Sequence, residues 1–190
     1  MLAIAIATLV LAAPAPGTPV RAEAQVCRNL APAELRGRVD VLLRSIDVAI
    51  APDEWRALGP AAGPVLAGIA DDAGVLPTRR ARALWGLVHL SGKDAAPALA
   101  RHALEEAAPL PLRLAAVRGL AAVSTGDRAE ATLRPVLEAA LDARVRAVAA
   151  EQLVEKTAGA SCAVVRAQVE HETSVGRALL AKALGACAGR

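Results

Sequence analysis

Apolar and polar residues follow two helical patterns along most of the chain, and both recur about every 33 residues. The first pattern runs through residues 80–87 (RARALWGL) and returns at 113–120 (RLAAVRGL), with Arg, Ala, Gly and Leu at the same positions. Further steps place an arginine at 146 and at 177, again followed by aliphatic residues at helical spacing. Four occurrences of one pattern predict four copies of one structural unit.

A second pattern lies between these copies, with mostly apolar residues at i, i+3 and i+4, which is one face of a helix. Each unit therefore holds a first helix, which carries the arginine, and a second helix. One helix pair cannot bury its apolar face alone, so the units stack on one another. The sequence predicts an all-α, right-handed α-solenoid of about four helical hairpins. The second helices carry Leu66/Ile69/Ala70, Leu99/His102/Ala103, Leu133/Val136/Leu137 and Val165/Gln168/Val169.

The segment that precedes the repeats has a different pattern. Within residues 25–51, Leu35, Val39, Leu42 and Ile46 share one face of an amphipathic helix but lack the repeat pattern. We expect this helix to cap the first hairpin at the N-terminal end. The repeat domain then spans residues 52–190.

The start of each helix carries a family resemblance. Pro77, Pro111 and Asp142 open first helices, an arginine and small residues follow, and residues 96–99 (APAL) open a second helix. This arrangement resembles the HEAT-like repeat, especially its short bilin-lyase-type version. The resemblance implies a scaffold or binding module, and some similar proteins act in bilin attachment or on nucleic acids. Tetratricopeptide and ankyrin repeats fit less well, because their aromatic and Thr-Pro-Leu-His signatures are missing.

The N-terminus has the features of an export signal. Leu2 to Ala13 form an apolar run, and a proline-rich stretch and the small-residue site Ala22-Glu23-Ala24 follow it. This order predicts a signal peptide of residues 1–24, although no basic residue precedes the apolar run. A buried N-terminal helix is the alternative, which the prolines disfavour. We expect a periplasmic or secreted protein with no membrane span after signal removal, since the run is too short to cross a bilayer.

Composition narrows the choice of fold and partner. Hydrophobic residues make up 55% of the chain, the mean hydropathy is +0.39, and Trp55 and Trp85 are its only aromatic residues. A chain so poor in aromatic residues is not expected to form a sheet. The net charge is +3 with a pI of about 9.1, a balance that nucleic-acid binders share. Acidic residues are interleaved with the arginines, however, so we expect no nucleic-acid partner.

The recurring arginine permits two interpretations. One guanidinium per unit would lie along the same edge of the stack and form an anion-binding ladder, because each planar group can grip a carboxylate or phosphate. Alternatively, each arginine is structural and bonds acids or helix-end carbonyls of neighbouring helices. We expect the structural role. The ladder consists of Arg80, Arg113, Arg146 and Arg177.

The histidines do not predict a metal site. A zinc site needs three or four converging ligands, and the chain has only His89, His102 and His171. His102 replaces an aliphatic residue in the repeat, which indicates a half-buried packing position. His171 lies between two glutamates near a helix end and is expected to face solvent. We expect no metal and no cofactor.

Two cysteines are expected at the same end of the stack. Cys162 lies at the start of one helix and Cys187 near the end of the next, and consecutive helices are antiparallel. A disulfide between them is therefore geometrically feasible, and an oxidising compartment would favour it. Two separate buried thiols are the alternative. Cys27 is left over, either free or paired with another molecule.

No nucleophile motif, phosphate loop or carboxylate pair stands out, so we expect no enzymatic activity. The main hypothesis is a non-catalytic exported scaffold that holds a protein partner. An accessory or lyase-like factor for a cofactor-bearing protein is the alternative. We expect Leu99, His102, Leu133, Val136 and Val165 to face the core. The side chains offset from them would form the partner-binding face: Arg101, Glu105, Arg134, Glu138, Arg166 and Glu170.

Overall fold

The computed structural model describes residues 30–45 and 49–188, and this part of the chain contains helices and no strands. The predicted signal segment and Cys27 lie outside the described residues. The helices are α2 (Pro32–Arg44), α3 (Pro52–Ala57), α4 (Ala62–Asp71), α5 (Pro77–Ser91), the 3₁₀ turn η1 (Gly92–Ala95), α6 (Ala96–Leu104), α7 (Leu110–Val123), α8 (Asp127–Ala139), α9 (Ala143–Lys156), α10 (Cys162–Glu170) and α11 (Ser174–Ala188).

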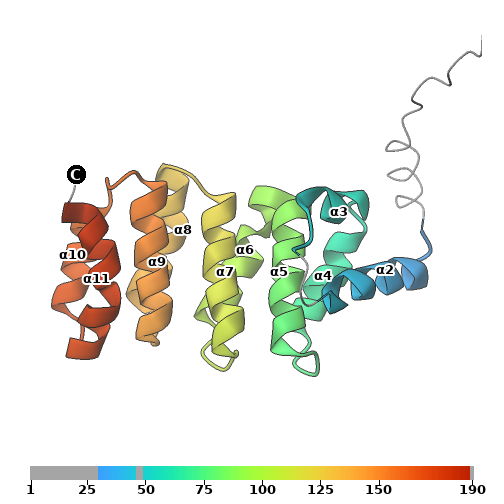
Figure 1. Cartoon of the computed structure of the whole chain (residues 1–190), viewed down its shortest axis with the longest axis horizontal. Coiled ribbons are helices and arrows are strands. Elements are labelled where there is room, and N and C mark those ends of the chain that lie inside the picture. Colours follow the sequence, from blue (N-terminus) through green and yellow to red (C-terminus); the bar gives the residue numbers. More distant parts are fainter. Residues whose placement is uncertain (1–29, 46–48, 189–190) are drawn as a thin grey trace, which may run out of the picture.

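The helices lie in two layers (Figure 1). The first helices α5, α7, α9 and α11 form one layer, in which each packs against the next. The second helices α4, α6, α8 and α10 form the other layer. At the N-terminal end, α2 runs across the direction of the other helices and packs against α4 and α5.

The closest helix pairs differ from those that the repeat pattern suggested. In the repeat predicted from the sequence, each unit begins with the arginine helix, so α5 would pair with α6. In the structure three arginine helices pack most extensively with the helix before them: α5 with α4, α7 with α6, and α9 with α8. The fourth, α11, packs more extensively with α9 than with α10. The connections within these pairs are short, which holds the two helices antiparallel. Each arginine therefore stands just after the tight turn of its own hairpin.

The ends of the helices follow local sequence signals. Pro32, Pro52 and Pro77 occupy first-turn positions, where a missing N–H costs nothing. The Asp142 side chain accepts a hydrogen bond from the Arg144 N–H and caps the start of α9. Gly126 has a φ of 54° just before α8, a backbone conformation that favours glycine.

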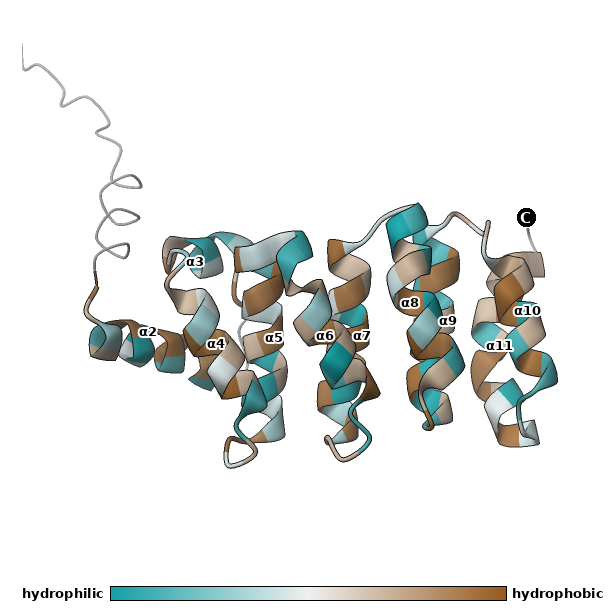
Figure 2. Cartoon of the chain, turned by 180° about the vertical axis from the view of Figure 1, so that it is seen from behind, coloured by the Kyte–Doolittle hydropathy of each residue, from teal (hydrophilic) through white to brown (hydrophobic). Residues whose placement is uncertain are grey.

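A single apolar core runs along the whole stack. It is a continuous cluster from Leu35 in α2 to Cys187 in α11. Figure 2 shows hydrophobic residues, in brown, on every helix of the two layers. The predicted core positions are confirmed, since all five are buried. His102 differs in degree, because only 1% of it is exposed and it was expected to be half-buried. Those five residues are Leu99, His102, Leu133, Val136 and Val165.

Two glycines let first helices approach second helices closely. A Cβ added to Gly86 would lie 2.8 Å from the Leu66 side chain and 2.8 Å from the Trp55 ring. A Cβ on Gly119, the equivalent position in α7, would lie 2.8 Å from Leu99. Because these neighbours are buried and closely packed, they have little room to move.

Replacing Gly86 by alanine should destabilise the protein by about 1–2 kcal/mol, because overpacking outweighs the better helix propensity of alanine. Gly185 in α11 is the matched control, since nothing lies within 4 Å of its added Cβ. Gly185→Ala should stabilise the protein by about 0.5–1 kcal/mol. Urea denaturation measures both values, and equal shifts in the two variants would contradict the close approach at Gly86.

Candidate binding surfaces and the arginine edge

The arginines of the repeat lie at the edge of the stack where second helices end and first helices begin. Arg80 Nε donates a hydrogen bond of 2.8 Å to the Ala70 carbonyl, in the last turn of α4. Arg113 Nε stands 3.5 Å from the Ala103 carbonyl at the equivalent place in α6. Both arginines are buried. Each therefore caps the C-terminal end of the preceding helix, whose last carbonyls lack partners within the helix.

Carboxylates complete this edge and connect neighbouring units. Arg113 Nη2 lies 2.7 Å from Glu106 Oε1, which also accepts a hydrogen bond of 2.9 Å from the Leu141 N–H in the following turn. Arg146 bonds Glu172 through two nitrogens, with Nη2 2.6 Å from Oε2. Its Nη1 donates to the Ala140 carbonyl at 2.6 Å. These contacts join adjacent hairpins through charged hydrogen bonds.

The fourth arginine does not share these contacts. Arg177 is exposed, and its side chain makes no hydrogen bond or ion pair within residues 30–45 and 49–188. Glu172 lies in the turn before α11, as Glu106 lies in the turn before α7, but it is bonded by Arg146 instead of by Arg177. The donors of Arg80, Arg113 and Arg146 thus face groups of the protein itself. These contacts support a structural role for Arg80, Arg113 and Arg146. They give no support for such a role at Arg177.

The acids of this edge are held in their charged form. Hydrogen bonds from the Arg146 side chain lower the pKa of Glu172, although burial acts in the opposite direction. The side chain of Arg144 lowers the pKa of Asp142 to about 2, where burial again opposes the change. Both carboxyl groups are therefore more acidic in the folded chain than in the unfolded one, which links folding to pH.

The predicted partner-binding face lies on the second helices, and its charges are partly paired with each other. Arg101 in α6 lies 2.6 Å from Asp71 of α4, while Arg134 in α8 lies 2.7 Å from Glu138. Glu105 lies 3.3 Å from Nδ1 of the buried His102. At α6 and α8, Arg101, Arg134 and Glu138 thus already have oppositely charged partners within the protein, whereas the buried Glu105 Oε2 makes no hydrogen bond to a described residue.

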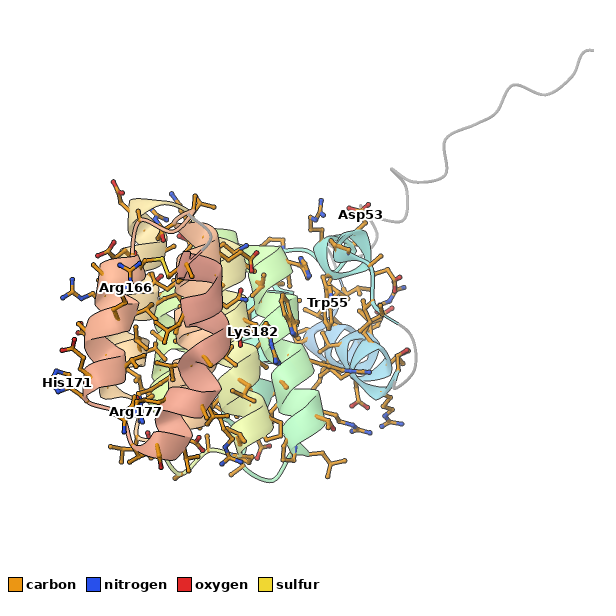
Figure 3. All side chains as sticks on the ribbon, turned by 60° about the vertical axis from the view of Figure 1, so that its left-hand side comes forward. Asp53, Trp55, Arg166, His171, Arg177 and Lys182 are labelled. Atoms are coloured by element: carbon orange, nitrogen blue, oxygen red, sulfur yellow. A yellow bond between two sulfur atoms is a disulfide. The ribbon has the colours of Figure 1, made fainter. Side chains whose placement is uncertain are left out.

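On α10 the same two positions are unpaired. Arg166 and Glu170 are exposed and have no hydrogen bond or ion pair to any residue that the structure describes. Figure 3 shows Arg166 pointing away from the body of the protein, with His171 further along the same outer side. His171 is exposed, as predicted. The face therefore ends in charges that are available to a partner.

The buried His102 joins two units. Its Nε2 lies 2.9 Å from Asp71 Oδ1, so an imidazole in α6 contacts a carboxylate in α4. Burial would raise the pKa of Asp71, but hydrogen bonds and charges from Arg101 and His102 lower it overall. His102 therefore acts in packing between units. No group of three or more His, Cys, Asp or Glu residues suited to a metal ion occurs within the described ranges.

Several hollows occur on the described part of the surface, including the following two. One, of about 650 Å³, follows α8 and includes Arg134, Glu138 and Pro135, so it belongs to the predicted partner-binding face. The other, of about 680 Å³, is an apolar groove between α2 and α3, where Val41 is 69% exposed. Sequence reasoning missed this groove, because the pattern placed α2 over the core without showing which of its apolar residues stay uncovered.

Cys162 and Cys187 are joined by a disulfide, with their Cα atoms 5.7 Å apart. The bond connects the start of α10 to the end of α11 and closes a segment of 25 residues. In the chain-entropy model such a loop contributes about 3 kcal/mol. The disulfide thus holds together the two ends of the helix pair α10–α11.

Comparisons with known proteins add no relationship: no protein-family model matches the sequence, and neither a curated protein nor a solved structure is similar to the chain. None of the helices within the described ranges has the length and apolar character needed to cross a membrane.

Replacing Arg113 by glutamine should lower the free energy of unfolding by about 1.5–3 kcal/mol, because it removes charged hydrogen bonds from a buried group. Arg177→Gln is the matched control at the same repeat position. It should change stability by less than about 0.5 kcal/mol, since Arg177 is exposed. Thermal and urea denaturation measure both variants, and a large loss in Arg177→Gln alone would reverse the assignment of the structural arginines.

Acid should weaken the arginine edge in a defined window. The lowered pKa values of Glu172 and Asp142 contribute stability that is present above their unfolded pKa values, near 4.5 and 3.8, and is lost as the pH falls towards 2. The melting temperature should therefore drop across this range. Glu172→Gln should melt lower at pH 7 and show a shallower drop in acid. Parallel curves for the two proteins would contradict a role for Glu172 in this dependence.

Proposed function

We propose that this protein is an exported, non-catalytic scaffold that holds a protein partner on the second-helix layer. In this proposal the row of hairpins is a right-handed α-solenoid of the HEAT-like type, and α2 caps its N-terminal end. The two-layer arrangement of α4 to α11 supports this proposal, because stacked hairpins create a long continuous face on each side.

One observation carries the choice of face. An arginine and a glutamate four positions later recur at equivalent places on α6, α8 and α10, which lie in the same layer. This repetition gives one row of arginines and one row of glutamates across the layer. The hollow along α8 is lined by Arg134 and Glu138, the α8 members of the two rows. Mixed charge of this kind favours a folded protein partner over a polyanion, because complementary charges steer association and fix orientation.

The α10 end of the face should contribute most to recognition. At α6 and α8 the two arginines already have acidic partners in the same chain, so a new ion pair there would replace an existing one. Arg166 and Glu170 have no such partners within the described residues and lose none on binding. We therefore assign the specificity of the proposed interaction mainly to these two side chains.

Export is part of the proposal. The apolar run and small-residue site of residues 1–24 support it, and so does the disulfide between Cys162 and Cys187. Disulfides persist in oxidising compartments outside the bacterial cytoplasm. The proposed location is the periplasm or the exterior of the cell.

The test uses the full chain with a C-terminal tag, produced in its source cells and cross-linked in the intact cell envelope. We expect a mature protein that lacks residues 1–24, as read from its mass, together with one specifically cross-linked protein. Exchanging the α10 charges, Arg166→Glu with Glu170→Arg, keeps the net charge but reverses the pattern. The exchange should reduce cross-linking at least about tenfold, because each charge then faces its like.

The matched control exchanges Asp53 and Arg56 on α3, an exposed ion pair of 3.1 Å at the far end of the molecule from Arg166 (Figure 3). This control should leave cross-linking unchanged, and both variants should keep the melting temperature of the parent. Equal cross-linking by the α10 exchange and the parent would exclude the second-helix face, and an unprocessed cytoplasmic protein would exclude export.

A further inference from the structure

The layer of first helices carries a second set of side chains in register, which the proposed function does not use. Trp85 on α5, Arg118 on α7, Glu151 on α9 and Lys182 on α11 occupy the same position of the repeat. Because these helices pack side by side, the four residues form a row across the layer. We define them as the first-helix row.

Trp85 is the apolar end of this row. The other tryptophan, Trp55, is 2% exposed and belongs to the core, whereas Trp85 is half-buried and presents part of its ring. The Trp85 ring stacks on His89, with centroids 6.1 Å apart and an interplanar angle of 24°. Burial lowers the pKa of His89, and the charge of Arg56 adds to this effect. The imidazole is therefore uncharged at neutral pH, and the two rings form an aromatic ledge.

Arg118 is the available charge of the row. It is exposed and makes no hydrogen bond or ion pair within the described part of the chain. Glu151, its neighbour on α9, is bonded at 2.7 Å by Lys182, which projects from the side of α11 that faces α9 (Figure 3). The carboxylate nearest along the row is thus already neutralised. An unpaired guanidinium is left one helix away from a partly exposed tryptophan.

Tryptophan and arginine are the residue types that most often dominate binding energy at interfaces. Adjacent packed helices have axes about 8–10 Å apart, and Trp85 and Arg118 stand on adjacent helices at the same repeat position. An extended peptide advances about 3.3 Å per residue, so residues three positions apart span about 10 Å. A ligand that crosses the helices in extended form can therefore contact both groups at once.

We propose that the first-helix row binds an extended acidic peptide segment in which an apolar residue is followed, three positions later, by a carboxylate. The apolar residue lies on the Trp85–His89 ledge, and the carboxylate pairs with Arg118. Charge complementarity selects this ligand, because the row has one unpaired cation and no unpaired anion among its four members. This site is separate from the second-helix face and does not depend on the function proposed for it.

The probe is a fluorescein-labelled peptide of ten residues that carries one leucine and, three positions later, one glutamate in a Gly/Ser background. We expect binding to the parent protein with a Kd below about 1 mM by fluorescence anisotropy. A control peptide with lysine in place of glutamate should bind at least about tenfold more weakly. Quenching of tryptophan emission on titration with an unlabelled peptide should report contact with Trp85.

Variants separate the site from general stability. Arg118→Ala should weaken binding about tenfold and Arg118→Glu should abolish it, while both keep the parental melting temperature because Arg118 is exposed. Arg166→Ala, on the other layer, should bind the peptide as the parent does. Trp85→Leu should weaken binding while retaining an apolar side chain, and Arg118→Glu supplies the test if that variant fails to fold.

Equal binding of the probe by Arg118→Glu and the parent would overturn the proposal, and so would no binding at about 1 mM protein. Displacement of the peptide by a single-stranded oligonucleotide of higher affinity would also overturn it, since the row would then serve nucleic acid. Loss of cross-linking in the α10 charge exchange, with peptide binding intact, would show that the two surfaces act independently.

Discussion

The structure depends on the buried arginine that caps the end of the preceding helix. A helix end leaves carbonyl groups without partners, and burying them in a stack of helices would be costly. Arg80 and Arg113 supply a donor at this place from the next helix, immediately after the turn. The cap thus fixes the turn, brings the two helices of each hairpin together, and makes the closest pairs those that share an arginine turn. The apolar core can then continue from one hairpin to the next.

Polar contacts between hairpins continue into the C-terminal half. Arg146 reaches Glu172 of the next turn, the Ser161 hydroxyl donates to Glu130 at 2.8 Å, and Lys182 pairs with Glu151. The disulfide of Cys162 and Cys187 then links the two helices of the pair α10–α11. These contacts add to the apolar packing between units. The row of helices is therefore held as one body on which both layers keep a fixed geometry.

The two layers offer different chemistry to a partner. The second-helix layer carries alternating charges that are mostly compensated within the protein, and Arg166 and Glu170 are the exception at α10. The first-helix layer holds the half-buried Trp85 on α5 and the exposed Arg118 on the neighbouring helix α7. Charges that are already paired can orient a bound partner but add little binding energy. An exposed aromatic ring and an unpaired cation can contribute most of the binding energy at one place. These are the physical grounds for treating them as two separate surfaces.

The sequence alone determined the helical class, the repeat period, most helix starts and the positions that face the core, because helical spacing decides which side chains share a face. The sequence also predicted that Cys162 and Cys187 lie at the same end of two consecutive helices. Only the tertiary structure decided which helices pair most closely, why Arg177 lacks the contacts of Arg113, and how deeply His102 is buried. Those features depend on groups from other units: Arg146 takes the acid that precedes Arg177, and Asp71 of α4 meets the His102 ring. A local pattern specifies the face of each helix, but it does not specify which neighbour will use that face.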